Sequence, residues 1–281
     1  MVVYVPILAE LTLPTVQRYA NKTFIVGPQY ACSMNPTQTN ALGAYANVHV
    51  IAPSAWVIDA VWSALRVRPM LLPAGIPIPR PSGQPRSIVV LITKSMSPAQ
   101  NDWYRSRPRA LRADDQTRLF QYGTYDRKTY HSALEQAKFA VVLTNTESQG
   151  FGYMEALAHD VPLLVWETPR YHNSHSEYSC FNGAPASSVP YFEENITGVT
   201  CTTAACMDTR VQSFMDDDWR AAQQFRPRQW LLENRLDADS VGAVWMREGK
   251  VSASERLDVV SVRDKTPKTK LRDMHSDQSS T

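Results

Sequence analysis

The segment from Phe139 to Trp166, FAVVLTNTESQGFGYMEALAHDVPLLVW, constrains the fold more strongly than any other stretch of the chain. It reads as a buried strand at Phe139–Leu143, a glycine-bearing loop, a helix, and a second strand at Val161–Val165. Two strands that flank one helix in this way are expected to be parallel and joined by a right-handed crossover. The same alternation of apolar strands and helices runs through most of the chain. We therefore predict an α/β fold with parallel sheets covered on both faces.

The 281 residues are enough for two domains, and a proline-rich stretch divides them. Residues 77–85, PIPRPSGQP, have the composition of a connector. We expect a short N-terminal domain over residues 1–85 and a second domain over residues 86–247, which begins with the strand Ser87–Ile92. Residues 248–281 have mixed charge, little apolar content and no periodicity, so they are expected to be disordered.

Composition excludes several classes of partner. A formal net charge of +2, from 29 basic and 27 acidic residues, gives no global electrostatic reason to bind nucleic acid or an anionic membrane. The apolar runs are too short for a transmembrane segment, and the N-terminus lacks the basic region of a signal peptide. The four cysteines form no C-x-x-C pair, which favours a reduced, cytoplasmic compartment.

The chemistry is expected in the loop Asn145–Gly152, because ligands of parallel sheets bind outside the carboxyl ends of the strands. Gly150 and Gly152 leave room for a ligand close to the backbone, and the N–H groups that open the next helix suit a phosphate or diphosphate. Glu147 and Glu155, with seven residues between them, flank this position. Since carboxylates repel phosphate, we expect both to accept hydrogen bonds from hydroxyl groups. A diphosphate flanked by two polyols, as in a nucleotide sugar, fits such a site.

These residues also have a purely structural interpretation. Acidic residues near a helix N-terminus are favoured by the helix dipole, and glycines before a helix can serve the turn alone. Other features have the same character. His159 ends the helix, where a cationic imidazole suits the dipole, and Trp56 falls on the apolar face of a helix that follows a capping Ser54. The spacing of His172 and His175 is typical of metal ligands but has no third ligand, which favours an ordinary surface loop.

The segment ESQGFGYMEAL followed by DVPLLVWE resembles the Glu, seven residues, Glu motif of retaining glycosyltransferases with the GT-B fold, in particular glycosyltransferase family four and related group-one enzymes. The resemblance extends to APSAWVIDAVW and LLPAGIPI near the end of the family's first domain, to SIVVLITK at the first strand of its second domain, and to FRPRQWLLENRL among its late helices. It covers most of residues 48–244 in order. It implies two Rossmann-like domains, the N-terminal one short or truncated.

The resemblance also implies a role for each residue of the motif. Glu155 would bind the ribose hydroxyls of the nucleotide, and Glu147 would face the donor sugar near its anomeric centre. The donor would be held at Ser148 and by the backbone N–H groups of Gly150, Phe151 and Gly152.

A basic residue after the first strand of the second domain, here Lys94, would neutralise the charge of the leaving diphosphate, with Arg105 or Arg107 as its partner. Members of the family use the helix dipole and basic side chains in place of a metal, so the resemblance implies transfer without a metal. No cofactor is expected, because the nucleotide sugar is itself the donor substrate.

The N-terminal half departs from the family, since the first domain is short and no glycine-rich loop precedes the connector. The acceptor site could therefore be completed by a partner chain or by a segment encoded upstream. Three functions follow as alternatives. The chain transfers a hexose-type sugar to a glycan, lipid or protein acceptor with retention of configuration, or it is a catalytically silent or partner-dependent nucleotide-sugar-binding protein, or it has another GT-B activity such as epimerisation.

Overall fold

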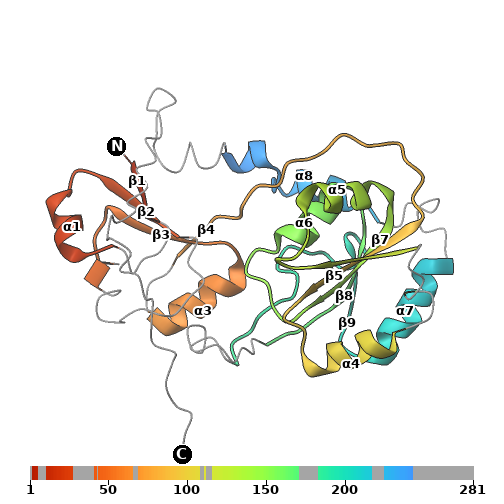
Figure 1. Ribbon diagram of the computed structural model, residues 1–281. Helices are drawn as coiled ribbons and strands as arrows, with labels where there is room; N and C mark the ends of the chain where they lie inside the picture. The colour runs from red at the N-terminus through yellow and green to blue at the C-terminus, as the bar shows by residue number, and fades with distance from the viewer. Residues whose placement is uncertain are drawn as a thin grey trace, which may run out of the picture.

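The computed structural model contains two α/β units, each built on a parallel sheet, and the units lie side by side (Figure 1). It describes residues 2–5, 11–27, 41–42, 44–65, 69–107, 111, 116–170, 183–216 and 225–242. The prediction of an α/β fold with two parallel sheets is confirmed. Among the described helices, none has the length and apolarity needed to cross a bilayer.

The first unit is a sheet of four parallel strands in the order β1-β2-β3-β4. Val2 pairs with Thr23, Phe24 with Val48 and Ile51 with Met70, so each new strand is added beside the preceding one. The elements are β1 (Val2–Val5), α1 (Leu13–Arg18), β2 (Thr23–Val26), β3 (Val48–Ala52), α3 (Ala55–Leu65) and β4 (Met70–Leu71). Because β3 and β4 end at the same edge of the sheet, that edge also carries the start of α3.

The connector between the units packs on the second unit before the predicted boundary. Ile76 is almost fully buried in the core of the second unit. Its N–H donates to the carbonyl of Leu236 at 3.0 Å, and its own carbonyl accepts from Ala238 at 3.1 Å. The connector thus ties the end of the first sheet to the last described helical segment. The division at residues 85 and 86 stays a prediction.

The second unit is a sheet of five parallel strands in the order β6-β5-β7-β8-β9. Its elements are β5 (Ile88–Lys94), α4 (Pro98–Ser106), β6 (Thr117–Gln121), α5 (Arg127–Gln136), β7 (Ala137–Thr144), α6 (Phe151–Ala158), β8 (Leu163–Trp166), β9 (Gly198–Cys201), α7 (Ala204–Asp216) and α8 (Pro227–Glu233). Strands β7 and β8 with α6 between them form the predicted parallel unit, in which Val142 pairs with Val165.

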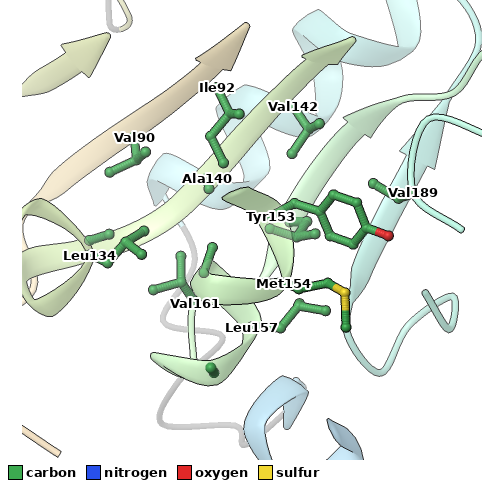
Figure 2. Packing of buried hydrophobic residues seen from close by; sticks show 14 of the residues in the cluster. Val90, Ile92, Leu134, Ala140, Val142, Tyr153, Met154, Leu157, Val161 and Val189 are labelled. Atoms are coloured by element: carbon green, nitrogen blue, oxygen red, sulfur yellow. The ribbon is translucent and has the colours of Figure 1, made fainter. Parts of the chain in front are cut away.

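Helices cover both faces of this sheet (Figure 1). On one face α5, α6 and α8 pack over alternate residues of the strands, such as Val90 and Val142, and on the other face α4 and α7 pack over Val89 and Val141. Figure 2 shows Met154 and Leu157 of α6 in the same buried cluster as Val90 and Val142 of the strands. Strand positions buried on both faces need apolar residues, and this explains the continuous apolar runs Ile88–Ile92 in β5 and Phe139–Leu143 in β7.

Two findings differ from the sequence-based expectations. The polar stretch after β8 contains a strand, β9, at Gly198–Cys201. Cys201 at its end forms a disulfide with Cys206 at the start of α7, although the cysteine count favoured a reduced compartment. The cytoplasmic location stays a prediction, as does the surface role of His172 and His175, which lie outside the described residues together with the predicted disordered tail.

Candidate active site

The candidate site lies at the carboxyl edge of the second sheet, where β5 ends at Lys94 and β7 at Thr144. These two residues are paired in the register of the sheet. The loop that carries Glu147 starts immediately after Thr144. A residue at the end of β5 is therefore placed beside this loop by the parallel topology alone.

Glu147 and Lys94 form an ion pair in which the Nζ and Oε2 atoms are 2.9 Å apart. Glu147 is buried, and burial raises the pKa of its carboxyl group above the ordinary value, while the charge and hydrogen bond of Lys94 oppose the shift. The ammonium of Lys94 also lies 4.4 Å from the ring centroid of Tyr122, which is exposed. Lys94 is thus held between a carboxylate and an aromatic face, both at the open edge of the sheet.

The loop turns into α6 at Gly150, which has the left-handed φ of 77°. A Cβ atom at this position would lie 1.8 Å from Cε1 of Tyr153, so glycine is required for conformation and for space. No side chain of residue 150 caps the helix, and the exposed Phe151 is its first residue. The first-turn N–H groups of Phe151 and Gly152 thus open α6 at the same edge as Lys94. A helix terminus of this kind is suited to an anion.

Glu155 lies one turn further along α6 and is also buried. Its Oε1 atom accepts hydrogen bonds from Nε of Arg127 at 3.1 Å and from Nη2 at 2.6 Å. Nε2 of His131 lies 3.5 Å from the same oxygen. All of these contacts fall on Oε1 and come from α5. The geometry leaves Oε2 as the atom through which Glu155 can accept hydrogen bonds from a ligand.

His159 was expected to be cationic at the end of α6, and this is wrong. Its Nε2 lies 2.9 Å from Nδ1 of His131. Burial, followed by the charges of His131 and Arg86, lowers the pKa of His159 to about 4, so the ring is neutral at pH 7. The helix dipole favours a positive charge here, but loss of solvation outweighs it. The carbonyls of His159 and Asp160 accept instead from the guanidinium of Arg86, at 2.7 and 2.9 Å.

The backbone of Glu147 is held by the segment that follows β8. Its N–H donates to the carbonyl of Ser187 at 2.9 Å. Glu167, the residue after β8, accepts from the N–H of Ser188 through Oε1 at 3.2 Å, while its buried Oε2 has no hydrogen-bond partner among the described residues. Burial raises the pKa of the Glu167 carboxyl group. The Ser188 hydroxyl donates to the carbonyl of Thr144 at 2.9 Å and so joins β7 to this segment.

The first unit contacts the same loop. Nε1 of Trp56, in the first turn of α3, donates to the carbonyl of Glu147 at 2.8 Å. The side-chain amide of Gln149 accepts from the N–H of Ala74 at 2.9 Å and donates to its carbonyl at 3.4 Å. The hydroxyl of Tyr191 donates to the carbonyl of Pro53. The candidate site therefore lies where the two units meet.

Arg105 and Arg107 lie elsewhere on the second unit. Both are at the far end of α4, which has nine residues and so extends about 13 Å from its start near the carboxyl edge. Arg105 is exposed, and Arg107 donates to the carbonyls of Tyr104 at 2.8 Å and Leu111 at 3.1 Å. In the part of the chain that the structure describes, the cation paired with Glu147 is Lys94. A role of either arginine as partner of Lys94 stays a prediction.

Three residues of the site were missed by sequence reasoning, namely Arg127, His131 and Trp56. Arg127 is the first residue of α5 after Asp126, whose carboxylate caps the helix by accepting from Thr129 N–H at 2.8 Å. The start of α5 faces the carboxyl edge because β6 precedes it, and this signal was available. Trp56 falls on the apolar face predicted for this helix, and that periodicity does not indicate a partner for its indole N–H. Within the described ranges, no group of three or more His, Cys, Asp or Glu side chains is arranged to hold a metal.

Comparison with solved structures shows which fold these elements make. The chain is similar to a mutant of S. aureus TarM in complex with fondaparinux, α-GlcNAc-glycerol and UDP, with a TM-score of 0.55 and 13% identity over 81% of this chain. It is similar to Anabaena Alr3699/HepE in complex with UDP and glucose, with a TM-score of 0.59 and 12% identity over 89% of this chain. Sucrose-phosphate synthase from Thermosynechococcus elongatus gives a TM-score of 0.54 at 12% identity over 89% of this chain.

These similarities show the fold, and the fold is that of GT-B glycosyltransferases. The chain spans 50% of the TarM chain, 77% of the HepE chain and 74% of the sucrose-phosphate synthase chain. A scan against protein-family models and a search of curated proteins find no match.

Proposed function

We propose that the protein is a glycosyltransferase that moves a sugar from a nucleotide-diphosphate donor to an acceptor hydroxyl. One observation carries the proposal. The Lys94–Glu147 ion pair, the N-terminus of α6 and Glu155, which is paired with Arg127, all lie at the same edge of the second sheet. UDP is present in the solved structures of TarM and HepE, which have the same fold. A UDP sugar is therefore the first donor to test.

In the proposed reaction the diphosphate lies at the first-turn N–H groups of α6, near Ser148 and the backbone of Gly150, Phe151 and Gly152. The helix terminus and Lys94 neutralise the charge that develops on the leaving group as the glycosidic bond breaks. Glu155 accepts the ribose hydroxyls through Oε2, because Oε1 is occupied by Arg127. Neither a metal nor a cofactor is part of this proposal.

Glu147 faces the donor sugar in this arrangement. Its carboxylate is paired with Lys94, and its backbone is fixed at both the N–H and the carbonyl. We further propose retention of the anomeric configuration and a hexose-type donor, in line with the resemblance to family four. We also propose that a partner chain contributes to the acceptor site.

The test is release of UDP from a panel of UDP sugars, with water or added acceptors, together with calorimetric titration of UDP. Glu147→Gln is expected to abolish turnover and leave the affinity for UDP within about twofold, because it replaces the group facing the sugar and keeps both Lys94 and the N-terminus of α6. Glu155→Gln is expected to weaken UDP binding by roughly tenfold. NMR of the released sugar at early times reports its configuration.

Two results would contradict the proposal in different ways. If the protein binds UDP sugars but turns none over with any acceptor, it is a binding protein and not an enzyme. If both carboxylate variants have equally small effects on turnover and on UDP affinity, the motif serves only the fold.

A further inference from the structure

The contact between Trp56 and Glu147 joins a residue of the first unit to the loop of the second unit that carries the candidate sugar-facing carboxylate. The indole N–H donates to the carbonyl of Glu147 at 2.8 Å, and the two residues are 91 positions apart in the chain. This hydrogen bond acts on the backbone. The orientation of the Glu147 side chain therefore depends on it only through the peptide unit.

Trp56 is itself fixed by packing across the boundary between the units. The apolar cluster formed by Ala52, Val57, Ala60 and Val61 of the first unit includes Trp56 at its margin. Ala184 and Ala186 of the second unit pack against the same cluster. Ser187, the next residue along, holds the N–H of Glu147. The two hydrogen bonds to the backbone of Glu147 thus come from the two sides of the same packed boundary, from Trp56 in the first unit and from Ser187 in the second.

Two other contacts bind the units together beside the loop. The amide of Gln149 pairs with both backbone groups of Ala74 in the connector, and the hydroxyl of Tyr191 donates to the carbonyl of Pro53 just before α3. The hydroxyl of Tyr153 links these contacts, since it donates to the carbonyl of Gln149 and accepts from the N–H of Tyr191. The loop 147–150 is therefore bound to the first unit at Glu147 and to the connector at Gln149.

We propose that Trp56 is a positioning residue for Glu147, so that the first unit, although short, sets the geometry of the donor-sugar half of the site. This inference rests on the proposed function. In the part of the chain that the structure describes, the side-chain contacts of Glu155 come from Arg127 and His131, both within the second unit. Loss of the Trp56 contact should accordingly affect the sugar half of the site and spare the nucleotide half.

The test compares Trp56→Phe with Trp103→Phe in the full chain. Trp56→Phe keeps an aromatic ring and removes the indole donor. Trp103→Phe also removes an indole donor, one that makes a 2.8 Å hydrogen bond to the exposed Asp208. This contact lies on the face of the second sheet that α4 and α7 cover. Turnover of a UDP sugar, affinity for UDP, and amide hydrogen exchange of peptides covering residues 145–153 are measured for each variant.

The expected result for Trp56→Phe is a loss of kcat of roughly tenfold or more, with UDP affinity unchanged, because a small displacement of a reacting group has large kinetic effects. Exchange in residues 145–153 should be faster than in the wild type. Trp103→Phe should show neither effect. Tyr191→Phe, which removes a second contact between the units, should change both readouts in the same direction by a smaller factor, and it replaces Trp56→Phe if that variant does not fold.

Unchanged hydrogen exchange in residues 145–153 overturns the proposal whatever the activity. Faster exchange with an unchanged kcat also overturns it, because the contact would then be structural only. A wild-type protein that neither binds UDP nor turns over any donor refutes the proposed function, and with it any catalytic meaning of the contact. The three failures are distinguishable because hydrogen exchange requires no substrate.

Discussion

Replacing Lys94 by methionine should destabilise the protein in a pH-dependent manner. The substitution keeps most of the apolar stem of the side chain and removes the charge that is paired with Glu147. The side chains of Lys94 and Glu147 are 29% and 11% exposed, so the pair is largely but not completely withdrawn from water. Removal of one partner from a fully buried pair costs about 3–5 kcal/mol. Allowing for the exposure of Lys94, we expect a loss of about 2–3 kcal/mol at pH 7.

The sign of the pH dependence follows from the pKa of Glu147. Burial raises this pKa in the folded state, and Lys94 lowers it again in part. Without Lys94 the folded-state pKa rises further above the unfolded value. A carboxyl group whose pKa is raised in the folded state does not lower the free energy of unfolding at pH values below its pKa in the unfolded state. It lowers this free energy as the pH rises through its pKa in the folded state. The difference between Lys94→Met and wild type should therefore be small at about pH 4 and largest above neutrality.

Urea denaturation at several pH values measures this difference, and a thermal scan should show a fall of roughly 4–12 °C at pH 7. The double variant Lys94→Met/Glu147→Gln should recover most of the lost stability, because it leaves no unpaired carboxylate. Glu233→Gln, on the exposed side of α8, is the matched control and should show no pH-dependent effect. A loss that is equal at pH 4 and pH 8, or no loss at pH 7, would refute the reasoning.

Three further predictions concern single residues of the site. Gly150→Ala should lower the free energy of unfolding, measured by urea denaturation, by about 2–4 kcal/mol, because the new Cβ would overlap a tyrosine ring and the backbone has a left-handed φ of 77°. In the control Gly152→Ala the new Cβ meets no atom closer than 3.6 Å, and the stability should stay within about 0.5 kcal/mol of wild type. Glu167→Gln should raise stability by about 1–3 kcal/mol above pH 6 and have little effect near pH 4, because burial raises the pKa of this carboxyl group and its Oε2 has no hydrogen-bond partner among the described residues. Equal stability of variant and wild type at all pH values would contradict this prediction. Arg127→Met should change stability by less than about 1 kcal/mol, because the Arg127 side chain is 69% exposed. It should weaken UDP binding roughly tenfold in calorimetry, because Glu155 is no longer held in a fixed geometry. Unchanged affinity would show that Arg127 is not part of the nucleotide site.

The sequence pattern predicted the strands of the second sheet that are buried on both faces. β5 and β7 require apolar residues at successive positions, and such runs cannot be satisfied on a surface. β9 was missed because Gly198–Cys201 includes Gly198 and Thr200 and so lacks a continuous apolar run. It is a strand because β8 offers it hydrogen-bonding groups in register, from Leu163 with Gly198 onward. Pairing of this kind depends on a partner distant in sequence.

The site was predictable only where topology determines it. Lys94 and Glu147 are 53 residues apart, yet each follows a parallel strand, and the carboxyl ends of such strands share one edge. The direction of a single side chain is set instead by its packing. Ser54 was expected to cap α3, but its buried hydroxyl has no hydrogen-bond partner within the described ranges. Trp56, two residues later, contacts the loop of the other unit, and no periodicity indicates that.

The two carboxylates of the motif are therefore held in different ways. Glu155 is fixed within the second unit by Arg127, an exposed side chain that solvent and ligand can reach. Glu147 is buried, paired with Lys94, and fixed at its backbone by Ser187 and by Trp56 of the first unit. If the units separate, the contacts of Glu155 persist, while Glu147 loses one of its two backbone hydrogen bonds. Binding of the nucleotide should thus tolerate separation of the units, and the chemistry at the sugar should require that they be docked.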